Sequence, residues 1–198
     1  ECTLDWEGPT QANTILLPNA TGTLGYVALS TTTITSETAS ILIDNLPDEF
    51  DSFVFHINAH PVDDSDNLRA RFLDTSGNPL SASSTYGYYR ATDAGDSSAD
   101  NATFIDITGT TIGSGTHEGV SVDCKLRGRN FTTSSTEVVP PILTGHIVGH
   151  YNSSVFSGGD FYGGMNDTNV QAIRGIQFFF SDGNVARATV EVYGIQGT

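Results

Sequence analysis

Basic side chains are scarce in this 198-residue sequence. Lysine and arginine together number 8, with Lys125 as the single lysine, against 23 aspartates and glutamates, and the formal net charge is -15 at pH 7. No cluster of cations could neutralise the phosphates of a nucleic acid, so we expect no nucleic-acid partner. The acidic surplus favours solubility and repulsion between copies, and it suits a saline environment that screens this repulsion.

Long apolar runs and cysteines are scarce as well. No stretch approaches the ~20 apolar residues that a membrane-spanning helix requires, so we expect no membrane partner. The two cysteines, Cys2 and Cys124, are too few for a disulfide scaffold. They could form one bond if the N-terminal segment lies beside the strand that holds Cys124, and the sequence leaves this open.

Recognisable catalytic motifs are missing. The sequence has no Gly-x-Ser-x-Gly elbow, no phosphate-binding loop and no paired-cysteine motif. Carboxylates are plentiful enough to include a glycosidase pair, but nothing in their spacing marks two of them as convergent. We therefore expect a protein that is not an enzyme and that requires no cofactor.

What the sequence does contain is β-strand patterning. Apolar and polar residues alternate in short segments from about residue 26, and no window shows sustained helical periodicity. Turn signals separate about ten strand candidates at the spacing that is typical of a sandwich. We predict a single all-β, antiparallel sandwich domain over residues 26–198.

Residues 1–25 show no strand pattern and form a predicted N-terminal arm. This segment contains two prolines and a few isolated apolar residues, namely Trp6, Ile15, Leu16 and Leu17. Such an arm either packs across its own domain or docks onto a neighbouring subunit. The sequence does not decide between these roles.

Residues 172–195 carry the strongest strand signal. An apolar run that ends at Phe180 is followed by Ser181-Asp182-Gly183-Asn184, and alternation resumes at Val185. Asp-Gly between β-rich flanks is typical of a tight reversal in which the glycine adopts a positive φ. We predict a β-hairpin whose second strand has one polar and one apolar face, the apolar one formed by Ala186, Ala188, Val190 and Val192.

The same segment carries a family resemblance. It runs Ala172-Ile173-Arg174-Gly175-Ile176-Gln177-Phe178-Phe179-Phe180-Ser181-Asp182-Gly183-Asn184-Val185-Ala186-Arg187 and continues to Val192-Tyr193-Gly194-Ile195. This resembles the C-terminal end of a family of small tailed-phage virion proteins. In that family "ala-ile-x-x-ile-x-phe-x-phe-ser-ser-gly-asn-ile-ala-x-gly" runs into "leu-tyr-gly-ile" near the chain end.

Two earlier blocks follow the order of the same family. Ala39-Ser40-Ile41-Leu42-Ile43 and Phe50-Asp51-Ser52-Phe53 are similar to "thr-ala-ser-ser-ser-ile-asp-phe" leading to "tyr-asp-x-tyr". His60-Pro61-Val62-Asp63-Asp64 and Asn67-Leu68-Arg69-Ala70-Arg71-Phe72 are similar to "val-x-pro-ala-thr-asp-gly" followed by "leu-x-leu-arg-x-ser". The match departs from the family where Asp64 replaces a usual Gly, Phe50 and Phe53 replace Tyr, and Asp182 replaces Ser.

The resemblance implies a jelly-roll-like β-sandwich located in a phage virion. The corresponding function is that of a capsid decoration or a tail or appendage subunit, which docks on other virion proteins and on itself as a homo-oligomer. The family has no assigned active site to transfer. The alternative function, from a different class, is a carbohydrate-binding module or the receptor-binding tip of a phage fibre, because a sandwich presents loops suited to a host surface glycan.

Three acidic residues in one short run are candidate metal ligands. Asp63, Asp64 and Asp66 could supply oxygen atoms to Ca²⁺, as could the segment that holds Asp93, Asp96 and Asp100. Neither segment has the spacing of an EF-hand, and a solvated acidic loop is the alternative interpretation.

Tyrosines and histidines supply the remaining candidates. Tyr86, Tyr88 and Tyr89 are possible glycan or partner contacts, although aromatic alternation in a sandwich is more often core. His56 and His60, like His146 and His150, lie four residues apart on one strand, which is about 13 Å and too far to share a metal ion. A metal site would need one histidine from each strand, for example His56 with His146, and a pH-sensitive subunit contact is the other interpretation.

Overall fold

The computed structural model describes residues 25–50, 52–93, 95–109, 112–129, 139–152, 155–166 and 169–195. Within these residues the chain forms twelve β-strands and confirms the all-β prediction. No helix in this part of the chain is long and apolar enough to cross a membrane. The strands are β1 (Val27–Ile34), β2 (Ile41–Ile43), β3 (Ser52–Pro61), β4 (Leu68–Leu73), β5 (Tyr86–Thr92), β6 (Gly95–Ala102), β7 (Ile105–Asp106), β8 (Gly119–Arg127), β9 (Ile142–Asn152), β10 (Val155–Met165), β11 (Gly175–Phe180) and β12 (Val185–Ile195).

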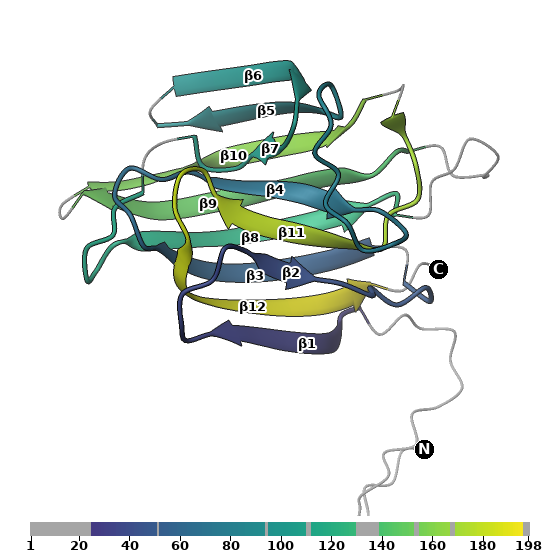
Figure 1. The fold of residues 1–198 in the computed structure, drawn as a ribbon, viewed down its shortest axis with the longest axis horizontal. Helices are drawn as coiled ribbons and strands as arrows, with labels where there is room; N and C mark the ends of the chain where they lie inside the picture. The colour runs from purple at the N-terminus through teal and green to yellow at the C-terminus, as the bar shows by residue number, and fades with distance from the viewer. Residues whose placement is uncertain are drawn as a thin grey trace, which may run out of the picture.

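The strands form two antiparallel sheets that pack as a sandwich. The larger sheet has the order β1-β12-β3-β8-β9-β10-β5-β6, and the smaller has the order β2-β11-β4-β7. The smaller sheet lies in front of the larger one, over its middle strands (Figure 1).

The connectivity of eight of these strands is that of a jelly roll. Leaving out β5, β6, β9 and β10, the first strand pairs with the last, the second with the seventh, the third with the sixth and the fourth with the fifth. This nesting of strand pairs is the double Greek key of a jelly roll. The four omitted strands extend the larger sheet beyond β8.

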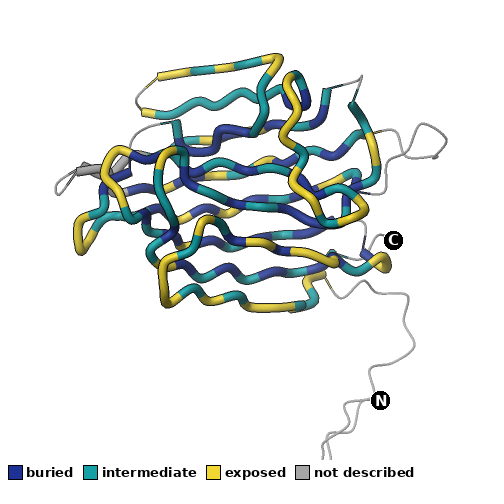
Figure 2. The backbone as a smooth tube through the Cα atoms, in the orientation of Figure 1, coloured by how far each residue is buried: buried dark blue, intermediate teal, exposed yellow. Residues whose placement is uncertain are grey.

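Alternation within the strands builds the core. Phe53, Phe55 and Ile57 of β3 point inward and are at most 1% exposed, and Phe178 of β11 meets them from the other sheet. The rings of Phe55 and Phe178 lie 5.8 Å apart, edge to face. Buried residues concentrate in the central strands, whereas exposed ones gather in the edge strands and the connections (Figure 2). Each such side chain contributes about 1.5–3 kcal/mol of hydrophobic stabilisation.

The predicted β11–β12 hairpin is wrong. These strands are consecutive in the chain, but β11 pairs with β2 and β4, whereas β12 pairs with β1 and β3. The turn at residues 181–184 therefore carries the chain from one sheet to the other, and Gly183 does not adopt a positive φ. The Asp66 carboxylate accepts hydrogen bonds from Ser181 Oγ and from the backbone N–H of Asp182, both at 2.7 Å, and thereby stabilises this crossing.

The acidic segment that begins at Asp93 also differs from expectation. Most of it forms the edge strand β6, which pairs with β5. Its alternation is hidden in the sequence because both of its faces are largely solvated. The predicted arm, with Trp6, Ile15, Leu16 and Leu17, lies outside the described residues, and so does Cys2.

Candidate functional site: the outward face of the larger sheet

The larger sheet has one face on the core and one face directed away from it. Side chains alternate between the two faces of a strand, so the residues between the core positions point outward. On β3 these are Val54, His56, Asn58 and His60, all half-buried or exposed. No strand of the described chain covers this outward face.

A row of alternating acidic and imidazole side chains crosses the outward face. The strand registers place Glu191 opposite His56, His56 opposite Asp123, Asp123 opposite His146, and His146 opposite Asp160. We call these five residues, on the adjacent strands β12, β3, β8, β9 and β10, the acid–imidazole ladder. These residues are spread along the chain from residue 56 to residue 191, and the order of the strands in the sheet brings them together.

Neighbours in the ladder interact directly. His56 Nδ1 contacts Asp123 Oδ1, and His146 Nδ1 lies 2.9 Å from Asp160 Oδ1. Glu191 accepts a hydrogen bond from the hydroxyl of Tyr193 at 2.9 Å, which raises the pKa of that tyrosine. Cross-strand pairs of this kind are the units that stabilise the face of a sheet.

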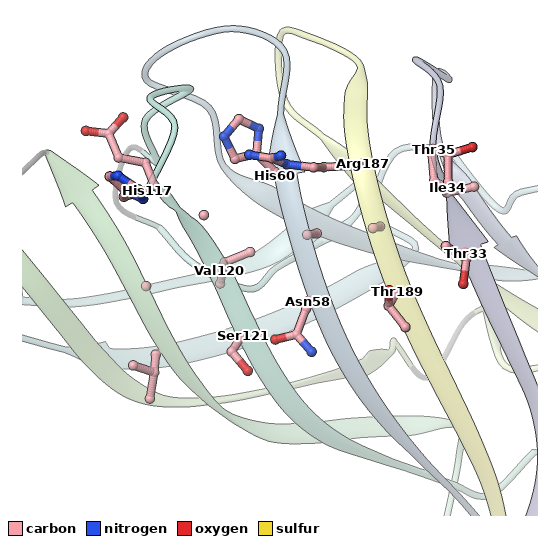
Figure 3. A pocket seen from close by; sticks show the side chains of 16 residues that line it. Thr33, Ile34, Thr35, Asn58, His60, His117, Val120, Ser121, Arg187 and Thr189 are labelled. Carbon is pink, nitrogen blue, oxygen red and sulfur yellow. The ribbon is translucent and has the colours of Figure 1, made fainter.

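A groove of about 720 Å³ runs beside the ladder on the same face (Figure 3). One continuous row of residues, each paired with the next across neighbouring strands, lines the groove: Thr33, Thr189, Asn58, Ser121 and Val148. The next row holds His60 and Arg187, which lie side by side at the upper end of the groove (Figure 3). Hydroxyl, amide, imidazole and guanidinium groups therefore line one shallow groove.

The loop before β8 forms one end of this groove, and its position is fixed by polar contacts. His60 Nε2 lies 2.9 Å from the carbonyl oxygen of Gly115. The Nδ1 atom of the same ring is buried and has no hydrogen-bond partner among the described residues. Asp64 Oδ1 accepts hydrogen bonds from the backbone N–H and the hydroxyl of Ser114, at 2.7 and 2.8 Å. These two bonds hold the pKa of Asp64 below its usual range.

The three predicted tyrosines do not share a surface. Tyr86 is fully buried, with its hydroxyl donating to Leu80 O at 2.9 Å and accepting from Phe72 N–H at 2.8 Å, so its prediction as a contact residue is wrong. Burial raises the pKa of Tyr86. Tyr88 also points inward, where its ring stacks on Phe104.

Tyr89 alone of the three faces outward. Its ring stacks on Tyr162 with the centroids 5.3 Å apart, and Tyr162 is 55% exposed. The hydroxyl of Tyr89 donates to Asp96 at 2.9 Å, which raises the pKa of Tyr89. Sequence reasoning missed Tyr162 as a site residue because the pairing of β5 with β10 has no local signal.

The three predicted metal ligands do not form one cluster, because Asp64 is engaged elsewhere. Asp66 is buried against the β11–β12 turn, and Asp64 is held by Ser114, so the three carboxylates of the run do not converge. Among the described residues, no group of three or more His, Cys, Asp and Glu side chains is arranged to hold a metal ion. His56 and His146 are not on neighbouring strands, because β8 lies between them.

The acidic residues of the second predicted cluster also have separate roles. Asp93 Oδ2 accepts a hydrogen bond from Gly158 N–H at 3.0 Å, whereas Asp96 binds the hydroxyl of Tyr89. Asp100 is exposed on β6 and, together with Tyr89, lines a separate pocket from the groove described above. This cluster is thus spread along the edge of the larger sheet.

Cys124 is a free thiol that points into the sandwich core. Burial raises the pKa of this thiol and keeps it protonated at neutral pH. The possible bond to Cys2 remains untested, because Cys2 lies outside the described residues.

Comparison with known proteins returns no relative. The chain matches no protein-family model, no curated protein and no solved structure.

Proposed function

We propose that this chain is a non-enzymatic structural protein of a tailed-phage particle, a capsid decoration or tail appendage subunit that docks through the outward face of its larger sheet. The three sequence blocks described above support the phage assignment, and they fall on strands of a jelly roll. The location that follows is the virion, and the partners are other virion proteins and further copies of this chain.

The observation that carries the docking proposal is the composition of the outward face. Exposed apolar side chains lie beside the acidic and imidazole groups of the ladder. Val148 is 46% exposed and Tyr162 is 55% exposed. Large apolar side chains at the centre of an uncovered face are typical of surfaces that bind a partner. The ladder adds a charge pattern that a partner can match, which sets register and orientation.

Immunogold electron microscopy of particles from the source, with antibody against this chain, tests the assignment. Regularly spaced label over the head identifies a decoration subunit, and label at the tail or at the vertices identifies an appendage. Particles without any label would refute the virion location.

Surface variants test the docking face. We expect Val148→Asp and Asp123→Lys each to reduce incorporation into particles about ten-fold or more, because both residues lie in the face. Glu49→Lys, in the exposed β2–β3 connection, is the matched charge-reversal control and should incorporate normally. Equal incorporation of all three variants would remove the outward face from the proposal.

A second function is favoured by the groove itself. Its lining of Asn58, Ser121, Thr189 and Arg187 offers the hydrogen-bonding groups that recognise sugar hydroxyls, in a hollow of the size that holds a small ligand. We therefore keep the carbohydrate-binding module, or the receptor-binding tip of a fibre, as the alternative.

Binding of the intact chain to an array of bacterial surface glycans tests the alternative. Asn58→Ala and Arg187→Ala should each abolish the signal, because a buried polar contact left unpaired costs about 1–3 kcal/mol. Arg174→Ala is the matched control, since Arg174 binds Asp44 at 2.6 Å, far from the groove lining. An array with no signal for the wild-type chain would eliminate this function.

A further inference from the structure

Two chain connections meet at one end of the sandwich. The β3–β4 connection, residues 62–67, and the β11–β12 connection, residues 181–184, both cross between the two sheets. They are joined by a hydrogen bond from Val62 N–H to Asn184 O at 2.9 Å. Asp63 and Asp66 of the first connection face Gly183 of the second.

Asp66 has an unsatisfied oxygen inside this junction. The residue is 0% exposed, and its Oδ1 accepts the two hydrogen bonds from Ser181 and Asp182. Its Oδ2 is equally buried and has no hydrogen-bond partner in the described structure. A buried carboxylate oxygen without a partner is costly, and native proteins satisfy such groups with a donor, a water or a cation.

The unsatisfied oxygen points to the same place as a second carboxylate. A Cβ atom added to Gly183 would lie 2.6 Å from Asp66 Oδ2 and also 2.6 Å from Asp63 Oδ2. Both oxygens therefore lie against the bare Cα of Gly183, and the space between them is at most 5.2 Å wide, because each is 2.6 Å from the same point (2.6 + 2.6 Å). The φ of Gly183 is not positive, so the backbone itself does not require glycine. The two carboxylates are what excludes a side chain here.

We propose that Asp63 and Asp66 bind one Ca²⁺ ion in this space. The donors are carboxylate oxygens, which hard cations prefer, whereas Zn²⁺ sites are built mainly from nitrogen and sulfur ligands. Ca²⁺ accepts oxygens at 2.3–2.6 Å in flexible geometry and completes a shell of six to eight with backbone carbonyls and water. Mg²⁺ requires a stricter octahedron and is expected to bind more weakly.

The ion ties together the two crossings of the sandwich. Because the protein supplies only two side-chain ligands, the affinity falls in the weak range of extracellular calcium modules, with Kd on the order of 10⁻⁴–10⁻³ M. Ca²⁺ bound only to the folded chain stabilises it by mass action, so saturating Ca²⁺ raises the Tm by about 3–5 °C. This role is independent of phage or glycan binding.

The experiment is calorimetric titration of the full chain, freed of metal with EDTA, with CaCl₂ and separately with MgCl₂ at equal ionic strength. Thermal unfolding is measured in parallel. We expect one Ca²⁺ per chain. Asp63→Asn should weaken binding about ten-fold or more, and it should fold normally because Asp63 is exposed.

Gly183→Ala tests the space without removing a carboxylate, and it should also weaken binding about ten-fold or more. Asp64→Asn is the matched control, because Asp64 belongs to the same run but is engaged with Ser114, and it should bind Ca²⁺ as the wild type does. Absence of binding up to 10 mM Ca²⁺ (about ten times the weakest expected Kd) would overturn the proposal. So would equal binding by wild type, Asp63→Asn and Gly183→Ala.

Discussion

Replacing Tyr86 with phenylalanine is a direct test of how the core is satisfied. The hydroxyl of Tyr86 accepts a hydrogen bond from Phe72 N–H and donates one to Leu80 O. Its removal takes this hydrogen-bond partner from the backbone N–H of Phe72, on β4, and from the carbonyl oxygen of Leu80. The ring stays in place, edge-on to the ring of Phe72 at 5.7 Å, so no large cavity forms.

The expected loss is the cost of two unsatisfied groups. Each buried polar group that loses its partner costs about 1–3 kcal/mol, so Tyr86→Phe should reduce the free energy of unfolding by about 2–6 kcal/mol. Tyr86 is 0% exposed, which leaves water little access to replace the hydroxyl. Tyr89→Phe is the matched control, because the hydroxyl of Tyr89 binds Asp96 at the surface, and it should change stability by less than about 0.5 kcal/mol.

Equilibrium unfolding in urea or guanidinium chloride measures both variants. The midpoint should fall for Tyr86→Phe while the slope m is unchanged, since the surface exposed on unfolding is nearly the same. A loss no larger than that of Tyr89→Phe would refute the reasoning. It would mean that the Tyr86 hydroxyl has no buried partners and would return Tyr86 to the list of possible contact residues.

Three further outcomes can be measured on the same protein. Burial raises the pKa of Tyr86 and of the Cys124 thiol in the folded chain, so the unfolded chain loses these protons first. The stability that these two buried groups contribute should therefore be fully present below the pKa values of the unfolded chain, about 8.5 for cysteine and 10 for tyrosine, and should fall as the pH rises above them. A free energy of unfolding that stays constant from about pH 8 to 11 would contradict the burial of both groups. Arg174→Ala should raise the pKa of Asp44 towards its ordinary value, because the hydrogen bond from the Arg174 guanidinium is the main cause that lowers it. NMR titration of the Asp44 carboxyl measures this pKa, and an unchanged value would contradict the pairing of the two residues. If the outward face associates copies of the chain, Asp123→Lys should weaken this association, because it reverses one charge of the ladder, and sedimentation-velocity runs with wild type and variant side by side would show equal association if the ladder has no part in it.

Much of the fold can be read from local patterns. Phe53, Phe55 and Ile57 alternate with polar residues, and this pattern correctly places them on a buried face and His56 and Asn58 on the opposite one. The all-β class, the sandwich and the break between strands at residues 181–184 were likewise predictable, because side-chain direction and strand ends depend on neighbouring residues only.

The candidate site was predictable only in its ingredients. The histidines on β3 and β9 were recognisable as polar-face residues, but Asp123 gives no sign in the sequence that it lies between them. Tyr86, Tyr88 and Tyr89 form one cluster in the sequence, yet the pleat places Tyr89 on the face opposite the other two. Its stacking partner Tyr162 is supplied by a strand that follows much later in the chain.

By itself, the sequence determined which residues alternate, where strands stop and how acidic the surface is, since each of these is set within a few residues along the chain. Tertiary structure decided which strands are neighbours. The consecutive strands β11 and β12 join different sheets, and no local pattern records that choice. The acid–imidazole ladder and the groove depend on strand pairing within the larger sheet, and the junction of Asp66 with Gly183 depends on the two connections that cross between the sheets.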